Sequence, residues 1–545
     1  MEKFRIVREL DDIQEYELPT NGLRILLKED PSVPVTTLMV SYRVGSRNEN
    51  HLQRGAVHIL EHMMFKGTPR YNKQSNTAIA SVLQNVGAIL NATTGNDGTN
   101  YFELLPSDQL GLALDIEADR MRQSLLRDED LALEMPVVLS EFDRMENSPM
   151  IALEQAVWRT AFRIHPYHYP VIGTRESIRN MTTQKLREFY DTYYWPNNAV
   201  ITVIGDFKTD EALSEIHKRF AKIPASPHPI PPMNILEPEQ NQKGFVEVQK
   251  PDKINAVSIA HKTPPALHPD IPPLDVLAKI LASGKTSRLY RALVETGYAT
   301  TIGSDVEKTH DPGLFSTYII LTPGTKHEEA EKATLNVYEQ IRTAGVTEAE
   351  VQRAKNQLYS RSAFARDSSI SLANELIPWI AAGDWTYLVT HTYKIHKVTA
   401  ADVKRVANTY LIDGKMTLGR LVSKEPEAPQ EKTHPLPKEF PSGNVEFEKE
   451  SESVSENAWP DTAVQSPGAT ILHPDELKKK LSDRIRVKNI SGFKVMSIPT
   501  SVKDVVTVVG SFEGAGHAYA DNPMIPLLTV SMLQQGTKYH DKFEF

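Results

Sequence analysis

The sequence predicts an α+β protein whose helices pack on mostly antiparallel sheets, and three observations support this class. Strand-like segments rich in β-branched residues alternate with segments of helical periodicity. The same alternation occurs in two successive blocks. The 545 residues, 40% hydrophobic and 24% charged, have the composition of a folded soluble protein and exceed one domain of roughly 150 residues.

The first block, residues 1–223, mixes strand and helix signals. Residues 37–44 and 199–204 are rich in β-branched side chains and predict strands. Residues 108–126 and 183–194 have apolar side chains at helical spacing and predict helices. We therefore expect one α+β domain here.

The second block, residues 243–424, repeats this order. Residues 255–260 and 314–321 predict strands, and residues 274–282 and 287–296 predict helices. A second domain of the same class follows from this repetition.

Two stretches have the composition of linkers. Residues 224–242 contain six prolines. Residues 425–474 are rich in proline, glutamate and serine and have few periodic apolar residues, which predicts extended chain. They separate the two blocks from each other and from a final segment, residues 475–545.

The final segment resembles the beginning of the first block. Residues 21–26 resemble residues 491–496, and residues 62–68 resemble residues 531–537. The matches are 45 residues apart in the first copy (67 − 22) and 44 apart in the second (536 − 492). We therefore expect residues 475–545 to be the start of a third, degenerate domain, cut short at the end of the chain.

Composition excludes several classes of protein. The 61 basic and 70 acidic side chains argue against nucleic-acid binding, which usually needs a basic face. Because the chain has no cysteine, a bound metal would need histidine and carboxylate ligands. No stretch approaches the roughly 20 apolar residues of a membrane span. The charged start lacks a signal peptide's apolar segment and predicts a cytoplasmic protein, or a periplasmic one if a signal was removed.

The strongest chemical signal is the pattern HILEH, in which His58, Glu61 and His62 lie within an amphipathic stretch, residues 55–65. Residues four apart share a helix face, so both imidazoles can reach one metal ion. Glu61 lies on the same side and can take a proton from a metal-bound water without being a ligand. This is the inverted zincin arrangement. A hydrogen-bonded pair of surface histidines is the alternative.

A zinc hydrolase usually needs a third protein ligand. Glu134 and Glu141, both within residues 128–147, are the candidates. They are seven residues apart, two helical turns, and would share a helix face. Their spacing does not choose between them.

Several stretches resemble, in the same order, motifs of the M16 metallopeptidases, the family of pitrilysin, insulin-degrading enzyme and mitochondrial processing peptidase. These stretches are Gly55–Thr68, Gly87–Thr94, Thr99–Tyr101, Val137–Glu141, His165–Tyr167, Tyr193–Ala199, Gly205–Asp206 and Gly284–Tyr290. The resemblance covers essentially the whole chain outside the linkers. It implies repeated M16-type domains, with a zinc site in residues 1–223 and none in residues 243–424.

By this resemblance, His58, His62 and Glu141 would bind one Zn²⁺ per chain. Glu61 would be the general base, and Glu134 would support the site without binding the metal.

The resemblance also implies that a peptide substrate adds as a strand beside Asn91, Ala92 and Thr93. One residue departs from the family's pattern, because Pro136 lies between the two glutamates. Since proline fits only the first turn of a helix without damage, we expect Glu134 near the start of its helix.

These features predict a zinc-dependent endopeptidase that hydrolyses peptides or unfolded polypeptides. The family also places an arginine and a tyrosine from a later domain over the reaction intermediate. Arg288 and Tyr290 have suitable side chains but not the family's spacing, so this pair stays unassigned. The alternative is a peptide-binding or assembly subunit that holds zinc but is catalytically incomplete. Such a subunit would need a homo- or hetero-oligomeric partner, or the missing homologous half, to complete the chamber.

Overall fold

The computed structural model describes residues 3–424, 485–490, 493–498, 506 and 508–510. The chain forms two compact units, one containing Met1–Ser423 and the other Lys424–Pro499. The predicted linker at residues 425–474 and the repeat match at residues 531–537 lie outside the described residues. Of the helices in the described part, none is long and apolar enough to cross a membrane.

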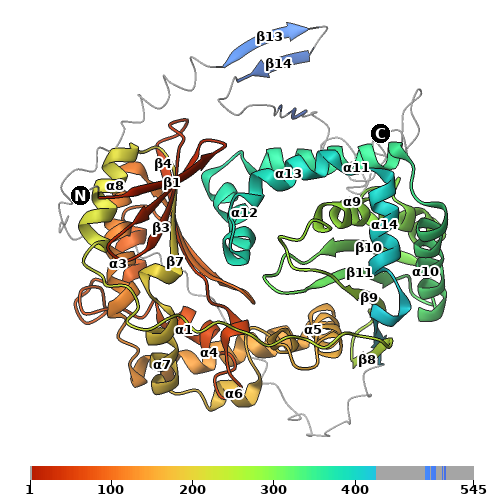
Figure 1. Cartoon of the computed structure of the whole chain (residues 1–545), viewed down its shortest axis with the longest axis horizontal. Coiled ribbons are helices and arrows are strands. Elements are labelled where there is room, and N and C mark those ends of the chain that lie inside the picture. The colour runs from red at the N-terminus through yellow and green to blue at the C-terminus, as the bar shows by residue number, and fades with distance from the viewer. Residues whose placement is uncertain (1–2, 425–484, 491–492, 499–505, 507, 511–545) are drawn as a thin grey trace, which may run out of the picture. The chain divides into compact units, whose positions relative to one another are not determined.

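The first unit contains two mostly antiparallel sheets with helices packed against them, which confirms the predicted α+β class (Figure 1). The first sheet has the strand order β1-β2-β3-β7-β4-β6-β5, and only β3 and β7 pair in parallel. Its strands are β1 (Arg5–Leu10), β2 (Ile13–Leu18), β3 (Leu23–Glu29), β4 (Val35–Tyr42), β5 (Ile89–Thr94), β6 (Thr99–Pro106) and β7 (Ala199–Gly205). Strand β5 therefore lies at an edge.

Helices of the first half bury one face of this sheet in a common core. The helices are α1 (Ala56–Met63), α2 (Ile79–Asn85), α3 (Leu110–Gln123), α4 (Asp128–Asn147), α5 (Pro149–Ala161), α6 (Arg175–Arg179), α7 (Thr183–Tyr193) and α8 (Thr209–Phe220). Strands β4 and β7 are buried along nearly their whole length. Burial on both faces explains why β7 is almost continuously apolar, whereas β4 also carries Thr36, Thr37 and Ser41.

The second sheet has the strand order β10-β11-β9-β12-β8. Its strands are β8 (Gly244–Lys250), β9 (Ala256–Lys262), β10 (Ala299–Val306), β11 (Leu314–Leu321) and β12 (Met416–Ser423). Only β8 and β12 pair in parallel. This order and these pairing directions repeat those of β5-β6-β4-β7-β3, so the two halves share one topology.

The second half has helices α9 (Ile271–Ala282), α10 (His327–Ala344), α11 (Glu348–Ala365), α12 (Ser369–Ala382), α13 (Tyr387–Lys397) and α14 (Ala400–Tyr410). Each half provides one helix to the other half's sheet (Figure 1). Helix α12 buries Leu376 and Trp379 with Met39 of the first sheet. Helix α5 packs so closely on the second sheet that a Cβ at Gly419 would lie 2.5 Å from a methyl carbon of Val157. This exchange ties the two halves together.

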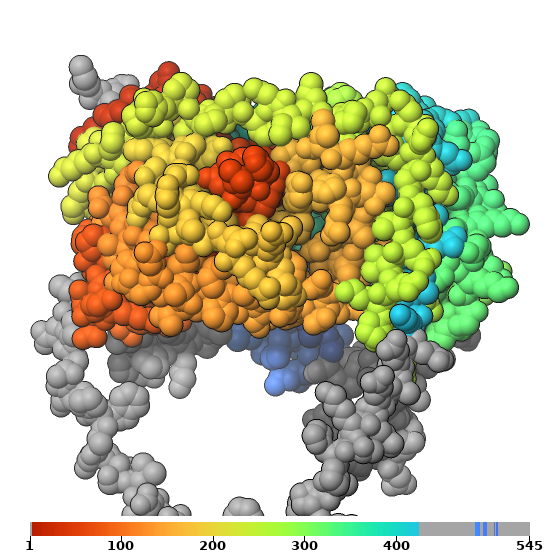
Figure 2. Space-filling view, turned by 90° about the horizontal axis from the view of Figure 1, so that it is seen from below, coloured from red at the N-terminus to blue at the C-terminus, as the bar shows by residue number. Residues whose placement is uncertain are grey.

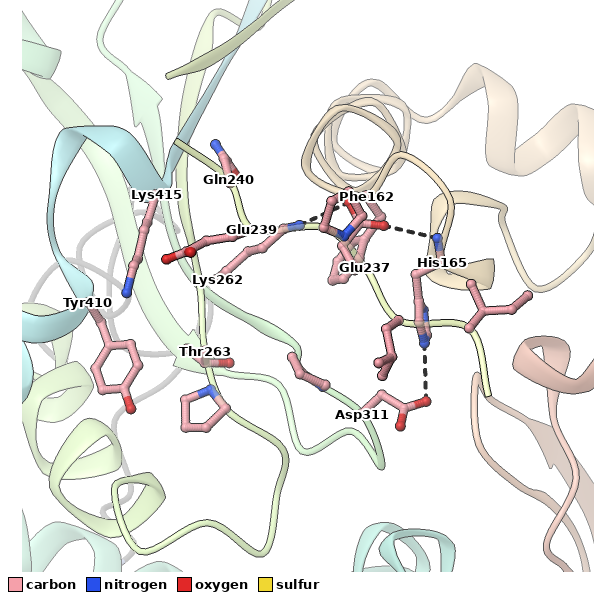
Figure 3. A pocket seen from close by; sticks show the side chains of 15 residues that line it. Phe162, His165, Glu237, Glu239, Gln240, Lys262, Thr263, Asp311, Tyr410 and Lys415 are labelled. Atoms are coloured by element: carbon pink, nitrogen blue, oxygen red, sulfur yellow. Dashed lines mark hydrogen bonds and ion pairs between the residues drawn. The ribbon is translucent and has the colours of Figure 1, made fainter. Parts of the chain in front are cut away.

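The proline-rich segment between the halves lies across the surface of the first unit, yellow-green in Figure 2. Glu237 fixes this segment (Figure 3). Its carboxylate accepts backbone N–H groups of Arg163, Ile164 and His165 at 2.8, 3.1 and 2.9 Å and contacts Lys262 Nζ at 3.0 Å. Beside it lies a cavity of about 290 Å³. One buried carboxylate thus joins both halves.

Two helical segments differ from the sequence prediction. Helix α9 begins at Ile271, before the predicted residue 274, because Pro272 and Pro273 fit its first turn. The predicted helix at residues 287–296 contains a π-helical turn, in which the N–H of Glu295 reaches the carbonyl of Tyr290 at 3.1 Å.

The second unit contains an antiparallel pair, β13 (Arg486–Ile490) and β14 (Phe493–Ser497). Ile490 pairs with Phe493 at its closed end. In the first sheet, Leu18 of β2 pairs with Leu23 of β3 in the same antiparallel way. The described residues thus contain a hairpin near the position that the sequence repeat matches to β2 and β3, and the third domain itself stays a prediction.

Candidate metal centre

Helix α1 carries His58, Glu61 and His62, and its start is fixed by backbone contacts. Gly55 precedes the helix with φ of 83°, and a Cβ there would lie 2.6 Å from the carbonyl oxygen of Ile172. Glycine is therefore required for both conformation and space. The buried carboxylate of Glu49 accepts N–H groups of the first turn at 2.9 and 2.8 Å, which caps the helix.

The structure brings His58, His62 and Glu141 together. One ligand atom from each residue lies within 4.8 Å of the other two. Among the described residues this is the single group of three side chains that could hold a metal ion. The Nε2 atoms of His58 and His62 lie 3.8 and 3.6 Å from Oε2 of Glu141. Ligand atoms around a tetrahedral zinc ion lie about 3.4 Å apart, given bonds of about 2.1 Å. The donor set and its spacing therefore fit zinc.

His58 is suited to bind a metal in its neutral form. Burial, and next the neighbouring His62, lower the pKa of His58 to about 4. The two rings lie 4.8 Å apart, centre to centre. A neutral imidazole keeps a lone pair for a metal ion, so no proton has to leave His58 at neutral pH.

Glu134 contacts a histidine rather than the shared centre. Its Oε1 accepts a hydrogen bond from Nδ1 of His62 at 2.8 Å, and its Oε2 forms an ion pair with Lys66. Burial alone would raise the pKa of Glu134, but hydrogen bonds from Lys66 and His62 outweigh it and lower the pKa. Glu134 thus orients His62 as an ionised carboxylate.

The expectation that Glu134 lies at a helix start is wrong. Helix α4 begins at Asp128 and continues through Pro136 to Asn147. Pro136 removes the N–H that would bond the carbonyl of Ala132, and both residues lie on the exposed face of the helix. Water can therefore bind the freed carbonyl, so the helix tolerates the proline. Glu134 and Glu141 both project from this continuous helix toward α1.

Glu61 lies against the edge strand β5. The hydroxyl of Thr94, the last residue of β5, donates a hydrogen bond to Oε2 of Glu61. Burial raises the pKa of Glu61, with the Thr94 bond and the charge of His62 acting against it. The carboxylate is thus held in one orientation and made more basic than an exposed glutamate.

The three residues expected to bind substrate lie on β5. Asn91 and Thr93 are exposed, Ala92 is buried, and β5 pairs only with β6 among the described strands. Its other side pairs with no described strand, and there the N–H of Ala92 bonds the side-chain oxygen of its neighbour Asn91 at 2.9 Å. A free edge of this kind can accept an extended peptide as an additional strand.

Sequence reasoning missed Lys66 and Thr94. Lys66 follows His62 by four residues, a helical spacing that could have indicated a shared contact with Glu134. Thr94 had no such signal, because its contact with Glu61 depends on where β5 packs beside α1.

Comparisons with known proteins show which family the chain resembles. Residues 24–175 match the family described as insulinase (peptidase family M16), and residues 180–358 match the peptidase M16 inactive domain. The zinc protease PqqE of Helicobacter pylori is 28% identical over 402 residues, covering 73% of this chain and 90% of that protein. A probable mitochondrial-processing peptidase subunit beta of Arabidopsis thaliana is 26% identical, covering 74% and 77%.

Solved structures show the same fold. The crystal structure of a protease from Helicobacter pylori has a TM-score of 0.72 and 28% identity, covering 76% of this chain and 100% of that chain. The periplasmic protease PqqL of Escherichia coli has a TM-score of 0.63 and 17% identity, covering 77% of this chain and 48% of that chain. The resemblance expected from the motifs is thereby confirmed, and the chain belongs to peptidase family M16.

Proposed function

We propose that this protein is a zinc-dependent endopeptidase that hydrolyses peptides or unfolded polypeptides. The observation that carries the proposal is the convergence of His58, His62 and Glu141, whose ligand atoms lie within 4.8 Å of one another, next to Glu61 on the same helix. Relatives named zinc proteases support it.

Each residue has a distinct part in the proposed reaction. When bound at His58, His62 and Glu141, zinc supplies a water with a pKa of about 7 and polarises the scissile carbonyl. Glu61 accepts the proton of the attacking water and delivers it to the leaving amine. Thr94 holds the Glu61 carboxylate in place for both transfers.

The edge strand β5 positions the substrate. An extended peptide would lie along Asn91, Ala92 and Thr93, where alternate residues such as Ala92 direct their backbone groups away from β6, and its backbone would lie beside Glu61 and the metal ligands. Backbone pairing gives affinity with little dependence on sequence, as suits unfolded polypeptides.

A second candidate is a zinc-binding subunit that is catalytically incomplete without a partner. The match of residues 180–358 to the M16 inactive domain favours it, because that half contributes no second metal site among the described residues. The Arabidopsis relative is itself named as a subunit.

Cleavage of an unstructured fluorogenic peptide tests the proposal. The zinc-loaded protein should cleave it, and a chelator should stop cleavage until zinc is restored. Glu61→Gln should keep its zinc but lower kcat about a hundredfold or more, since it removes the base. Glu129→Gln, an exposed glutamate of α4, is the control and should leave kcat unchanged.

Surviving turnover in Glu61→Gln would show that Glu61 is not the base. A protein that binds zinc but cleaves nothing in either form would support the second candidate instead.

A further inference from the structure

Two glutamates of α4 reach the same pair of histidines, yet they face different ring atoms. Glu141 faces the Nε2 atoms of His58 and His62 at 3.8 and 3.6 Å. Glu134 faces Nδ1 of His62 at 2.8 Å. Both have the same side chain and lie two turns apart on one helix, and a contact from outside α4 also distinguishes them.

The distinguishing group is Lys66. It lies in the turn that closes α1, where its N–H bonds the carbonyl of Met63 at 3.0 Å. Its ammonium group forms an ion pair with Oε2 of Glu134. The Lys66 side chain is 28% exposed and that of Glu134 only 10%, so this is a largely desolvated contact. No ion pair joins Lys66 to Glu141 among the described residues.

The hydrogen bond from His62 and the ion pair with Lys66 together constrain both oxygens of Glu134. One oxygen accepts the His62 ring N–H, and the other is occupied by Lys66, so neither is free to turn toward the Nε2 atoms. A carboxylate that accepts the Nδ1 proton also fixes the tautomer in which Nε2 carries the lone pair. Held in this way, Glu134 can orient His62 but cannot compete with Glu141.

Of the two histidines, only His62 has a carboxylate bonded to its Nδ1 in the described structure. Nδ1 of His58 is buried and has no hydrogen-bond partner in the described structure. The orientation of the two imidazoles therefore depends on the contact between Glu134 and His62, and through it on Lys66.

We propose that Lys66 is a positioning residue, which fixes Glu134 as the support of His62 and thereby leaves Glu141 as the third metal ligand. This inference rests on the zinc site of the proposed function. It goes beyond that function because it says why Glu141, and not Glu134, binds the metal. Lys66, a residue outside the metal-binding pattern, decides this.

Zinc affinity, measured by competition with a chromophoric chelator, tests the role of Lys66 without any need for catalysis. Lys66→Met should weaken zinc binding about tenfold to a hundredfold, the usual effect of losing a partner of a ligand. A charge effect alone has the opposite sign, because removing a cation near Zn²⁺ should strengthen binding. Lys66→Arg should restore most of the affinity. Lys73→Met, an exposed lysine, is the matched control.

A double-mutant cycle with Glu134→Gln shows whether Lys66 acts through Glu134. If it does, Lys66→Met should have little further effect in the Glu134→Gln background. The visible spectrum of the Co²⁺-substituted protein should also change in Lys66→Met and remain unchanged in Lys73→Met, since it reports ligand geometry. Circular dichroism of each variant identifies any loss of fold.

Three outcomes are distinguishable. Unchanged or tighter zinc binding in Lys66→Met would overturn the role of Lys66 while leaving the proposed function intact. An equal loss with and without Glu134 would also overturn it, because Lys66 would then act independently of Glu134. Failure of the unaltered protein to bind zinc would overturn both proposals.

Discussion

The two halves of the first unit share one strand topology and also one kind of side-chain cluster. In the first half, the carboxylate of Glu134 lies between His62 and Lys66, with one oxygen for each. In the second half, the carboxylate of Asp275 lies between His391 Nε2 at 2.8 Å and Lys308 Nζ at 2.6 Å.

The surroundings of the two clusters differ. The other ring nitrogen of His62 faces a second histidine's ligand atom and the carboxylate of Glu141, and these converge on one point. The other ring nitrogen of His391 is buried and has no hydrogen-bond partner in the described structure. Helix α9, which follows β9 as α1 follows β4, carries Asp275 within an otherwise almost wholly apolar sequence.

This comparison distinguishes what holds helices together from what binds a metal ion. A carboxylate between a histidine and a lysine can join two helices, as Asp275 on α9 does by bonding His391 on α13. A metal centre needs additional donors on the free side of the histidine, and in the described residues only the first half provides them. The role of each cluster is therefore open to separate tests.

The largest expected effect is the loss of zinc when Glu141 is removed. Glu141→Ala should weaken zinc binding by roughly a hundredfold or more, beyond the tenfold to hundredfold expected for a supporting residue. Equilibrium dialysis with zinc analysis measures this directly. Asp275→Ala should leave zinc binding unchanged. If Glu141→Ala retained zinc with unaltered affinity, the third ligand would have to be assigned elsewhere, with Glu134 next in order.

The next effect concerns stability and should appear in the second half. Asp275→Asn leaves the charge of Lys308 without its partner, so it should lower the free energy of unfolding by about 3 kcal/mol. Urea unfolding of the metal-free protein measures this change, with the exposed Asp413→Asn as control. A change below about 0.5 kcal/mol would show that the Asp275 cluster does not stabilise the second half.

The same cluster should give a pH dependence of stability. Burial tends to raise the pKa of Asp275, but Lys308 and His391 outweigh it and hold the pKa at about 2. A pKa below that of the unfolded chain means that the stabilisation is complete above about pH 4 and is lost as the pH falls through about 2. In Asp275→Asn, stability should therefore fall less steeply over this range than in the unaltered protein.

The smallest expected effect is on the orientation of the proposed base. Thr94→Val removes the hydrogen bond to Glu61 and should lower kcat about tenfold, the equivalent of one bond to a charged group. Zinc affinity should be unchanged, and Thr94→Ser should restore kcat because it keeps the hydroxyl. Peptide-cleavage kinetics beside a zinc titration distinguish these cases. Equal rates in all three proteins would remove Thr94 from the mechanism.

Local patterns in the sequence predicted a large part of this structure. The strands predicted at residues 37–44 and 199–204 correspond to β4 and β7, because both segments are rich in the β-branched residues that favour strands. The pair His58 and His62 could be recognised because both lie on one helical turn. Glu134 and Glu141 followed as candidates from the same spacing argument on a longer helix, and the resemblance to M16 peptidases assigned their separate roles.

Other features depended on contacts between distant segments. Nothing local indicates that α5 and α12 each cover the other half's sheet, since an apolar helix face does not specify its partner. The cluster around Asp275 joins residues more than 100 positions apart, so no motif contains it. Pro136 misled the prediction for Glu134 because proline's cost in a helix depends on whether the freed carbonyl can reach water.

The most direct test of this account is a crystal structure of the zinc-soaked protein with anomalous diffraction at the zinc edge. The account predicts one zinc ion bound by Nε2 of His58, Nε2 of His62 and the carboxylate of Glu141, with Glu134 bonded to Nδ1 of His62 and no zinc at Asp275. Zinc bound through Glu134, zinc at Asp275 and His391, or no zinc at the three predicted ligands would contradict it.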